Sequence, residues 1–393
     1  MNRSPVVIAF LVVIAVTSVI APGSSKAQGD TTERPFVRGG VYDKPMLGRL
    51  AGRIAIGGYA ELHARHERVD GARDEAGFVP KRFNLFVNSR VSDVVRFGAE
   101  LEFEDGAEEI VLEFAAIDLR LHRAATLRAG MILTPLGRFN LSHDSPLNEF
   151  TDRPLVATDL VGSAFSEAGV GAFGEFSAGG SGRLTYEVYA TNGLHDGLLL
   201  NSPDGTRLPL GRKNFEDANG SPALTGRFAW SPSETGEFGL SAYHGAYNAF
   251  IVEGTQVEPR RDVALAAVDA EWEIAGVRLS GEATTVRVEL PPSLNGLFAS
   301  RQRGAYIEAV RDIRRGVQAG LPNSVIAAKL RVDAVDFDTQ LRGDAITQVS
   351  VGINYRPTPD TVLKFDFVRG RAWDRFNNAS EFAKLLASVA TYF

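Results

Sequence analysis

Hydrophobic and polar residues alternate with a period of two along most of the chain. In RIAIGGYAELHAR, Ile54 and Leu62 belong to an apolar set, and Glu61 and His63 belong to a polar set. The alternation returns in RFGAELEFE, RLTYEVYAT, VRLSGEATTV, TVLKFDFVRG and KLLASVATYF. Successive side chains of a β-strand point to opposite faces, so this period predicts strands with one apolar and one polar face.

The number and connection of these segments favour a barrel. About sixteen segments recur along the chain, which suits a large barrel better than a sandwich. Short turns mostly alternate with long polar connections, notably residues 65–78, 135–165, 192–222 and 248–261. That asymmetry is typical of a transmembrane barrel with short periplasmic turns and long extracellular loops. Residues 312–325 read either as a long turn or as part of a helix, so the strand count within 304–337 stays open.

Periodicity alone does not separate a transmembrane antiparallel β-barrel from a soluble β-sandwich. The segments are long enough to cross a bilayer when tilted, which takes about nine to eleven residues. The chain has no Cys with which to staple a secreted sandwich. We therefore predict an all-β chain that forms a transmembrane barrel of about 16 strands.

The N-terminus has the features of a secretory signal peptide. Arg3 precedes an apolar run over residues 6–20, and the small residues Ser25 and Ala27 are spaced for cleavage. A membrane anchor is the alternative, but the run is shorter than the roughly 20 residues that a spanning helix needs. We predict a signal peptide over residues 1–27, a periplasmic segment over 28–50 and a barrel over 51–393, in the bacterial outer membrane.

Composition narrows the possible chemistry. Removing residues 1–27 takes away two basic residues and no acid, so the formal charge changes from −6 to −8, which argues against nucleic acid as a partner. The six His residues are scattered, and the spacing of His63 and His66 is weak evidence for a metal. We expect no metal and no cofactor.

Several stretches resemble one family. They are GGYAELH, GAFGEF, YEVYATNGL, LTGRFAWSP, VDAEWE and VGINYRPTPDTVLKFDF, together with TPLGRFN and TDRPLV. In this order they resemble the phosphate-selective porin O and P family of bacterial outer-membrane porins. The resemblance implies a sixteen-stranded barrel, commonly a homotrimer, whose third outer loop folds inward, and whose anion-selective members line the pore with many Arg and some Lys.

The polar faces of the predicted strands supply pore-lining candidates, namely Arg82, Asn84, Asn88, Arg90, Arg120 and Arg128. Such donors could attract anions. Alternatively, the arginines pair with acids of neighbouring strands, such as Glu100 and Glu102, and select nothing. Because acidic residues are interspersed, phosphate selectivity does not follow from the resemblance.

Residues 135–165 are the best candidate for a pore constriction. They contain Arg138, Asn140, His143, Asp144, Glu149, Asp152 and Arg153. Charged side chains at the narrowest ring of a wide pore set its selectivity, and opposed charges there would orient polar solutes. The alternative is an outer loop whose charges face water in weak surface pairs.

The leading functional hypothesis is a porin through which small hydrophilic solutes or inorganic ions, anions or phosphate among them, diffuse passively. A structural or ligand-binding barrel without an open channel is the second hypothesis. A barrel hydrolase is the third, suggested by the adjacent residues Ser142, His143 and Asp144. Sequence neighbours rarely form a triad, and no Gly-x-Ser-x-Gly elbow is present, so we expect no enzyme.

The chain ends on Phe393 without a polar tail. We interpret residues 384–393 as the closing strand, which must pair with the first strand to remove the sheet edges. Its terminal aromatics would then lie at the periplasmic rim, against membrane lipid. Phe393 also resembles the signal by which the outer-membrane assembly machinery recognises its clients.

Overall fold

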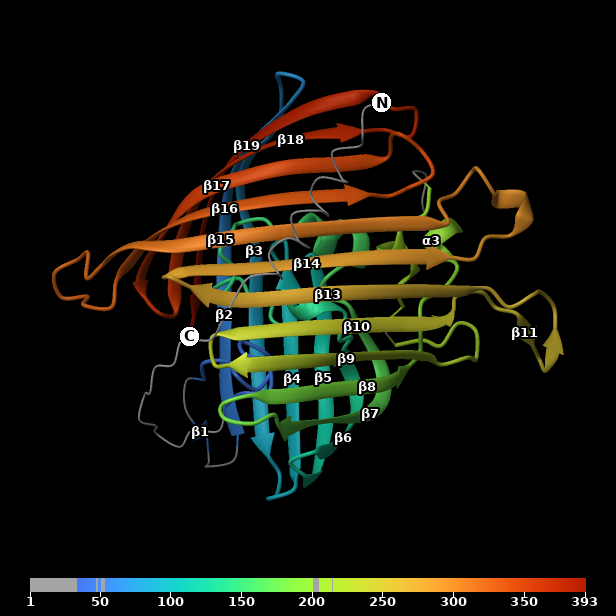
Figure 1. Ribbon diagram of the computed structural model, residues 1–393, viewed down its shortest axis with the longest axis horizontal. Coiled ribbons are helices and arrows are strands. Elements are labelled where there is room, and N and C mark those ends of the chain that lie inside the picture. Colours follow the sequence, from blue (N-terminus) through green and yellow to red (C-terminus); the bar gives the residue numbers. More distant parts are fainter. Residues whose placement is uncertain (1–33, 47–48, 51–53, 201–204, 214) are drawn as a thin grey trace.

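A computed structural model describes residues 34–46, 49–50, 54–200, 205–213 and 215–393. Within these residues, sixteen antiparallel strands close into one barrel (Figure 1). They are β2 (Ile54–Val69), β3 (Ala72–Arg90), β4 (Val95–Glu104), β5 (Glu109–His122), β6 (Ala125–Leu133), β7 (Ser166–Ser177), β8 (Arg183–Thr191), β9 (Ala223–Ser233), β10 (Gly236–Ala246), β13 (Asp262–Ile274), β14 (Val277–Val288), β15 (Arg301–Arg315), β16 (Val325–Asp336), β17 (Ala345–Thr358), β18 (Thr361–Trp373) and β19 (Ala379–Tyr392). The predicted fold class is confirmed.

Several smaller elements are not strands of the barrel wall. The two-residue strand β1 (Arg49–Leu50) pairs with β2, and β11 (Ile251–Val252) pairs with β12 (Thr255–Gln256) in a separate hairpin. The helical segments are α2 (Gly137–Leu141), η2 (Val156–Val161), α3 (Gly197–Leu200), η3 (Leu208–Gly211) and η4 (Pro292–Leu294). No helix in the described ranges has the length and apolarity of a membrane span. The signal-peptide prediction lies outside the described residues.

The exposed fractions of successive side chains distinguish the outer face of the barrel wall from the inner face. Phe365 and Phe367 are 55% and 44% exposed, whereas Asp366 between them is 5% exposed. An apolar side chain that points outward and a polar one that points inward suit a barrel with lipid outside and polar groups in the lumen. The apolar faces of the alternating segments therefore form the outer surface.

The barrel closes between β19 and β2, as the terminal segment predicts. Tyr392 pairs with Tyr59 in the antiparallel register. One residue further, the Phe393 amide donates to the Gly58 carbonyl at 3.0 Å, and the Gly58 amide donates to the Phe393 carbonyl at 3.2 Å. The Phe393 ring stacks on Phe83 at 5.7 Å between centroids. The final residue thus belongs to the sheet.

One expectation about the connections needs correction, and one open alternative is decided. Residues 65–78 are not a polar loop, because β2 continues to Val69 and β3 begins at Ala72. Only Asp70 and Gly71 turn the chain, both with positive φ. The segment is polar but its backbone is paired across a long hairpin, which its polarity alone does not reveal. In the open region, β15 extends to Arg315, and residues 316–324 form a turn rather than a helix.

Candidate pore constriction

The connection between β6 and β7, residues 134–165, lies inside the barrel. The Gly137 amide donates to Ser241 Oγ of β10 at 3.1 Å. The Thr151 amide donates to Asp366 Oδ2 of β18 at 2.8 Å. Both acceptors are on the inward face of the wall, and both strands are far round the barrel from β6. The loop therefore crosses the lumen.

Gly137 allows the loop to turn closely against the wall. Its φ is +71°, a value that favours glycine. A Cβ at this position would lie 2.2 Å from the carboxylate atoms of Glu282. Two residues later, the backbone amide of Phe139 donates a hydrogen bond to Glu282 Oε2 at 3.3 Å. A side chain at position 137 would push α2 away from β14.

Buried lysines hold the loop by its carbonyl groups. Lys364 Nζ donates to the carbonyl oxygens of Ser145 at 2.8 Å and of Phe150 at 3.3 Å. Lys329 Nζ donates to the Glu149 carbonyl at 2.5 Å. Hydrogen bonds from a charged donor are roughly twice as strong as neutral ones. The middle of the loop is thus tied to β16 and β18.

Two arginines continue this set of anchors. Arg331 Nη2 donates to the Asp152 carbonyl at 2.9 Å, and Arg356 Nη1 donates to the Pro146 carbonyl at 2.8 Å. Neither the two lysines nor these arginines were among the pore-lining candidates. The sequence feature that indicates such anchors is the spacing of Lys329 and Arg331. They are two residues apart on a strand, so both side chains lie on the same face.

Asp152 lies between basic side chains at the inner edge of the loop. Its Oδ1 is 2.8 Å from Arg65 Nη1, and its Oδ2 is 3.6 Å from Lys384 Nζ. The Asp152 and Lys384 side chains are each 22% exposed. Burial alone would raise the pKa of Asp152, but Arg65 and Lys384 outweigh it and lower that pKa below its ordinary value. A partly exposed carboxylate opposite basic groups makes a transverse field.

Arg153, the neighbouring candidate, points away from this opening. Its side chain is 5% exposed. Its Nη1 donates to the Ser163 carbonyl at 2.9 Å, and its Nη2 lies 4.0 Å from Glu102 Oε2. Arg153 therefore stabilises the loop through these contacts. Of the two neighbouring residues, Asp152 carries the solvent-accessible charge.

Arg138 and Glu149 line a cavity of about 890 Å³ near the short-turn end. Arg138 Nε is 2.8 Å from Glu271 Oε2, and Arg138 Nη1 is 3.2 Å from Glu237 Oε1. Glu149 Oε1 is 3.1 Å from Arg278 Nη2. Burial would raise the pKa of Glu149, yet nearby arginines, Arg278 among them, lower it overall. We call this cavity the vestibule.

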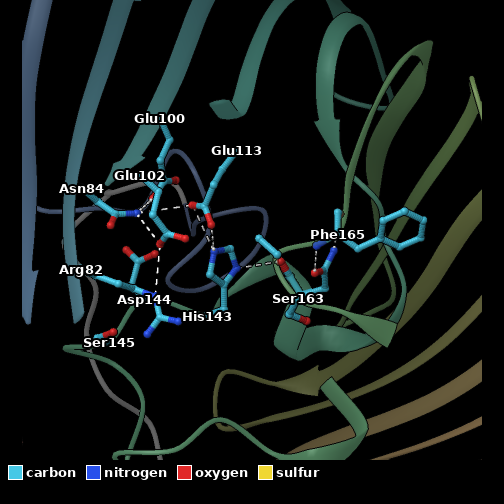
Figure 2. Close-up of polar contacts among 12 residues, drawn as sticks. Arg82, Asn84, Glu100, Glu102, Glu113, His143, Asp144, Ser145, Ser163 and Phe165 are labelled. Atoms are coloured by element: carbon cyan, nitrogen blue, oxygen red, sulfur yellow. Dashed lines mark hydrogen bonds and ion pairs between the residues drawn. The ribbon is translucent and has the colours of Figure 1, made fainter. Parts of the chain in front are cut away.

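Asn140 and His143 have structural partners. Asn140 Nδ2 donates to the carbonyls of Thr134 at 2.7 Å and Phe165 at 2.8 Å, and the Phe165 amide donates back to Asn140 Oδ1 at 2.8 Å. His143 Nδ1 is 2.9 Å from the Asn140 carbonyl, and its Nε2 is 3.4 Å from Glu113 Oε2 (Figure 2). Burial lowers the pKa of His143, which favours the neutral ring.

Asp144 accepts hydrogen bonds from both ends of the chain. Lys44 Nζ donates to Asp144 Oδ1 at 2.8 Å, and Tyr392 Oη donates to Asp144 Oδ2 at 2.8 Å. Burial raises the pKa of Asp144, whereas Asp144 and Glu100 raise the pKa of Lys44 against the effect of burial. These contacts therefore tie Asp144 of the loop to the N-terminal segment and to β19.

The hydrolase hypothesis needs Ser142, His143 and Asp144 to form a chain of hydrogen bonds. His143 instead contacts Asn140 and Glu113. Asp144 contacts Lys44 and Tyr392, as described above. These three neighbours do not have the geometry of a catalytic triad.

The inward faces of β3 and β4 form a buried polar cluster around the loop. Asn84 Nδ2 donates to Glu100 Oε1 at 2.9 Å and to Glu102 Oε2 at 3.1 Å. Arg82 Nη1 lies 3.1 Å from Glu61 Oε2, and Arg82 Nη2 lies 2.7 Å from Glu104 Oε1. Figure 2 shows Asn84, Glu100, Glu102 and Glu113 grouped together, with Glu113 beside His143. Arg82 and Asn84 thus pair with wall acids, as the second interpretation of the basic face expects.

The remaining pore-lining candidates are dispersed. Arg128 makes a bidentate pair with Asp118, at 2.8 and 2.9 Å. Asn88 and Arg120 are half-buried on the wall, and Arg90 is exposed at the end of β3. These side chains do not form one basic ladder.

Residues 34–46 occupy part of the short-turn mouth, and we call them the N-terminal strap. Arg183 Nη1 donates to the Pro35 carbonyl at 2.8 Å, and Arg38 Nη1 lies 3.1 Å from Glu271 Oε1. Lys44 is bound inside, between Glu100 and Asp144. The strap reaches the underside of the loop from this end of the barrel.

An apolar core fills part of the opposite, long-loop end. Residues of η2, α3 and η3 pack on inward apolar side chains of β10 and β13 to β16. The core contains Leu136, Val156, Leu160, Val161, Phe165, Leu194, Leu198, Leu199, Leu208, Ala223, Tyr243, Tyr247, Val263, Leu265, Val286, Val288, Tyr306, Val335 and Phe337. At this end of the barrel, apolar side chains therefore fill the lumen beside β10 and β13 to β16.

Among the residues that the structure describes, no three His, Cys, Asp or Glu side chains are grouped to hold a metal ion. Charged side chains line the vestibule, and the side chain of Asp152 is partly exposed there.

Comparisons with known proteins support the fold. No family model matches the chain. An uncharacterized protein of Aquifex aeolicus (strain VF5) is 26% identical over 363 residues, which cover 83% of this chain and 77% of that protein. An anion-selective porin from Comamonas acidovorans superposes with a TM-score of 0.54 at 11% identity, covering 86% of this chain and 99% of the porin.

The outer membrane channel DcaP of Acinetobacter baumannii also has a TM-score of 0.54, at 13% identity, covering 86% of this chain and 97% of that one. The chain has the barrel fold of outer-membrane porins. At these identities the likeness concerns the fold alone.

Proposed function

We propose that this barrel is an outer-membrane porin through which small hydrophilic or ionic solutes diffuse passively. The observation that carries the proposal is the position of residues 134–165, which cross the lumen and leave Asp152 partly exposed opposite Arg65 and Lys384. The vestibule leads toward this point, because Asp152 is among its lining residues. Residues 135–165 would then form the constriction.

We propose that the channel prefers anions, phosphate among them. Two basic side chains of the vestibule are clearly more exposed than the acids that they contact. Arg38 is 57% exposed against 27% for Glu271, and Arg278 is 39% exposed against 15% for Glu149. A solute that enters would meet the guanidinium groups first, which favours negative charge. The likeness to the phosphate-selective porin O and P family agrees with this preference.

Cellular context completes the proposal. Residues 1–27 would direct the chain across the inner membrane, and residues 28–50 would lie on the periplasmic side. Delivery to the outer membrane would use the assembly machinery, and membrane lipid would contact the exposed apolar face. The family likeness favours a homotrimer.

Single-channel recording in a planar bilayer tests the proposal. The refolded protein is expected to give discrete conductance steps and a reversal potential, in a salt gradient, of the sign for anion preference. Replacing Arg38 and Arg278 by Gln should move the reversal potential toward cations, because the vestibule loses two positive charges. The control is Arg90→Gln, which removes an exposed arginine outside the vestibule. An absence of conductance steps would overturn the porin assignment.

A second candidate function is a structural or ligand-binding barrel without an open channel. It is favoured by the apolar core, which packs η2 and α3 against the inner wall at the long-loop end. The same recordings decide between the two functions, because a sealed barrel inserts without conducting.

A further inference from the structure

A groove of about 970 Å³ lies on the outer face of the barrel, away from the lumen. One side is formed by β17, β18 and β19, and the other by the β2–β3 hairpin. Phe78 of the hairpin is 80% exposed, and Leu385 of β19 is 58% exposed. Such a concave apolar surface is unusual on a convex barrel wall. Its position facing the membrane suits hydrocarbon as the occupant.

Strand register arranges the groove in rows. One row runs Phe78, Ala64, Ala387, Phe365 and Ile353, each residue opposite the next on the neighbouring strand. Directly opposed side chains on one face of a sheet lie about 5 Å apart. The row is therefore a continuous apolar strip across five strands.

A second row lies one step nearer the long-loop end. It runs Ala76, His66, Leu385, Phe367 and Val351 in the same strand order. Successive outward residues on a strand are separated by about 7 Å. The two rows together are long enough to accept part of an acyl chain laid along the groove.

Arginines form the next row. Arg73 is opposite Arg68, Arg68 is opposite Ala383, and Ala383 is opposite Arg369. All three arginines are exposed. Like charges directly opposite each other repel, so an anion bound between Arg68 and Arg73 would remove that penalty. Glu381, the acid beside them, contacts Arg369 at 3.5 Å.

The β2–β3 hairpin gives the groove its second side. Register shifts occur between Glu61 and His63 and between His66 and Arg68. Such bulges bend a strand pair. In Figure 1 the tip of this hairpin (blue) projects beyond β19 at the top of the barrel. The bend places Arg68 and Arg73 beside an apolar groove rather than on a flat wall.

We propose that this outer groove binds a phosphate-bearing lipid of the membrane leaflet at the long-loop end. An acyl chain lies against the Phe365 and Phe367 rows, and a phosphate group meets Arg68, Arg73 and Arg369. The arginines stand directly beyond the apolar rows, which is where the headgroup of a lipid seated in the groove would lie. The site is independent of conduction through the lumen.

Native mass spectrometry of the refolded full barrel with diphosphoryl lipid A tests this site. The wild-type protein is expected to retain the lipid in micelles. Replacing Arg68 and Arg73 by Gln should weaken retention about twenty-five-fold, because each basic group near a membrane surface contributes about fivefold to binding of anionic lipid. A second variant, Ala387→Trp, fills the groove without removing charge and should also reduce retention.

The matched control replaces Arg287 and Arg301 by Gln. These arginines are also exposed and opposite each other at the long-loop end, but they lie on β14 and β15, outside the groove. Control retention should equal that of the wild type. Circular dichroism and heat-dependent gel mobility verify folding of each variant.

Three results would overturn the lipid site. They are equal retention by the Arg68 and Arg73 variant, equal retention of lipid A whose phosphates have been removed, and full competition by inorganic phosphate. The last result would identify a free-anion site instead of a lipid site. Conductance is measured separately in bilayers without lipid A, so failure of this site and failure of the porin function give different readouts.

Discussion

Asp152 and Arg153 are adjacent in sequence and have opposite environments. The Asp152 carboxylate is 22% exposed between Arg65 and Lys384, whereas the Arg153 guanidinium is 5% exposed beside Glu102. Exposure decides which of the two charges a solute can meet. Of the seven constriction candidates, Asn140, His143 and Asp144 are likewise buried and bonded within the protein, so they position the loop.

The lowered pKa of Asp152 leads to a pH prediction. A carboxyl whose folded pKa is depressed stays ionised as the pH falls through the ordinary range near 4. We therefore expect the reversal potential to keep the Asp152 contribution between pH 7 and pH 4. Asp152→Asn should shift the reversal potential further toward anions at both values, by a similar amount. A contribution that falls by about half at pH 4, as for a carboxyl with an ordinary pKa, would contradict this assignment.

The loop of residues 134–165 is an element whose position depends on other elements. Its own sequence contains two short helical segments, α2 and η2, which do not determine where it lies. Its carbonyls are held by Lys329, Arg331, Arg356 and Lys364 of β16 to β18. Each such charged hydrogen bond contributes about 1.5–3 kcal/mol. The wall thus selects the inward position of the loop.

Lys364→Met is expected to loosen this loop. The variant loses the hydrogen bonds to Ser145 and Phe150, which should destabilise the inward position by about 3–6 kcal/mol. Open-channel current noise should rise, and mean conductance should increase. Lys213→Met is the control, because Lys213 is 47% exposed and pairs with Glu216 outside the barrel wall. Identical noise in both variants would show that the Lys364 anchor is dispensable.

The whole barrel is closed by its last strand, β19, which pairs with β2 from Phe382 to Tyr392. Backbone bonds between Phe393 and Gly58 extend this pairing by one residue, and the Phe393 ring packs on Phe83. Closure removes the exposed sheet edges that would otherwise pair with other chains. The terminal aromatic therefore has a structural role in addition to the assembly signal that it resembles.

Phe393→Ala separates these two roles. The variant keeps the backbone bonds and loses the ring, so we expect a loss of about 1–2 kcal/mol in the free energy of unfolding. We measure the fraction of Phe393→Ala that assembles in the outer membrane of cells and the fraction that refolds in detergent. If the aromatic is also an assembly signal, the first fraction should fall much more than the second. Phe393→Tyr, which keeps an aromatic ring, should assemble normally. Equal losses in the cell and in detergent would leave the structural role alone.

Alternation along the chain, together with the lengths of the segments and of their connections, predicted a barrel of about sixteen strands and its closing strand, with the strand count open within residues 304–337. A strand has two faces, and Phe365, Asp366 and Phe367 show by their types alone which face meets lipid. The pattern also placed Arg82 and Asn84 on the inner face. It could not extend β2 and β3 through residues 65–78, because most residues of this hairpin are polar and lack the apolar alternation.

The interior was decided by tertiary structure. Whether Arg153 or Asp152 meets the lumen depends on Glu102, Arg65 and Lys384, which come from three other strands. Val263 and Leu265 point inward against η2 and α3, although inward positions elsewhere in the wall are polar. The local alternation of residue types distinguishes only the two faces of a single strand. What fills the lumen depends on contacts between residues far apart in sequence, and those contacts exist only after the barrel has closed.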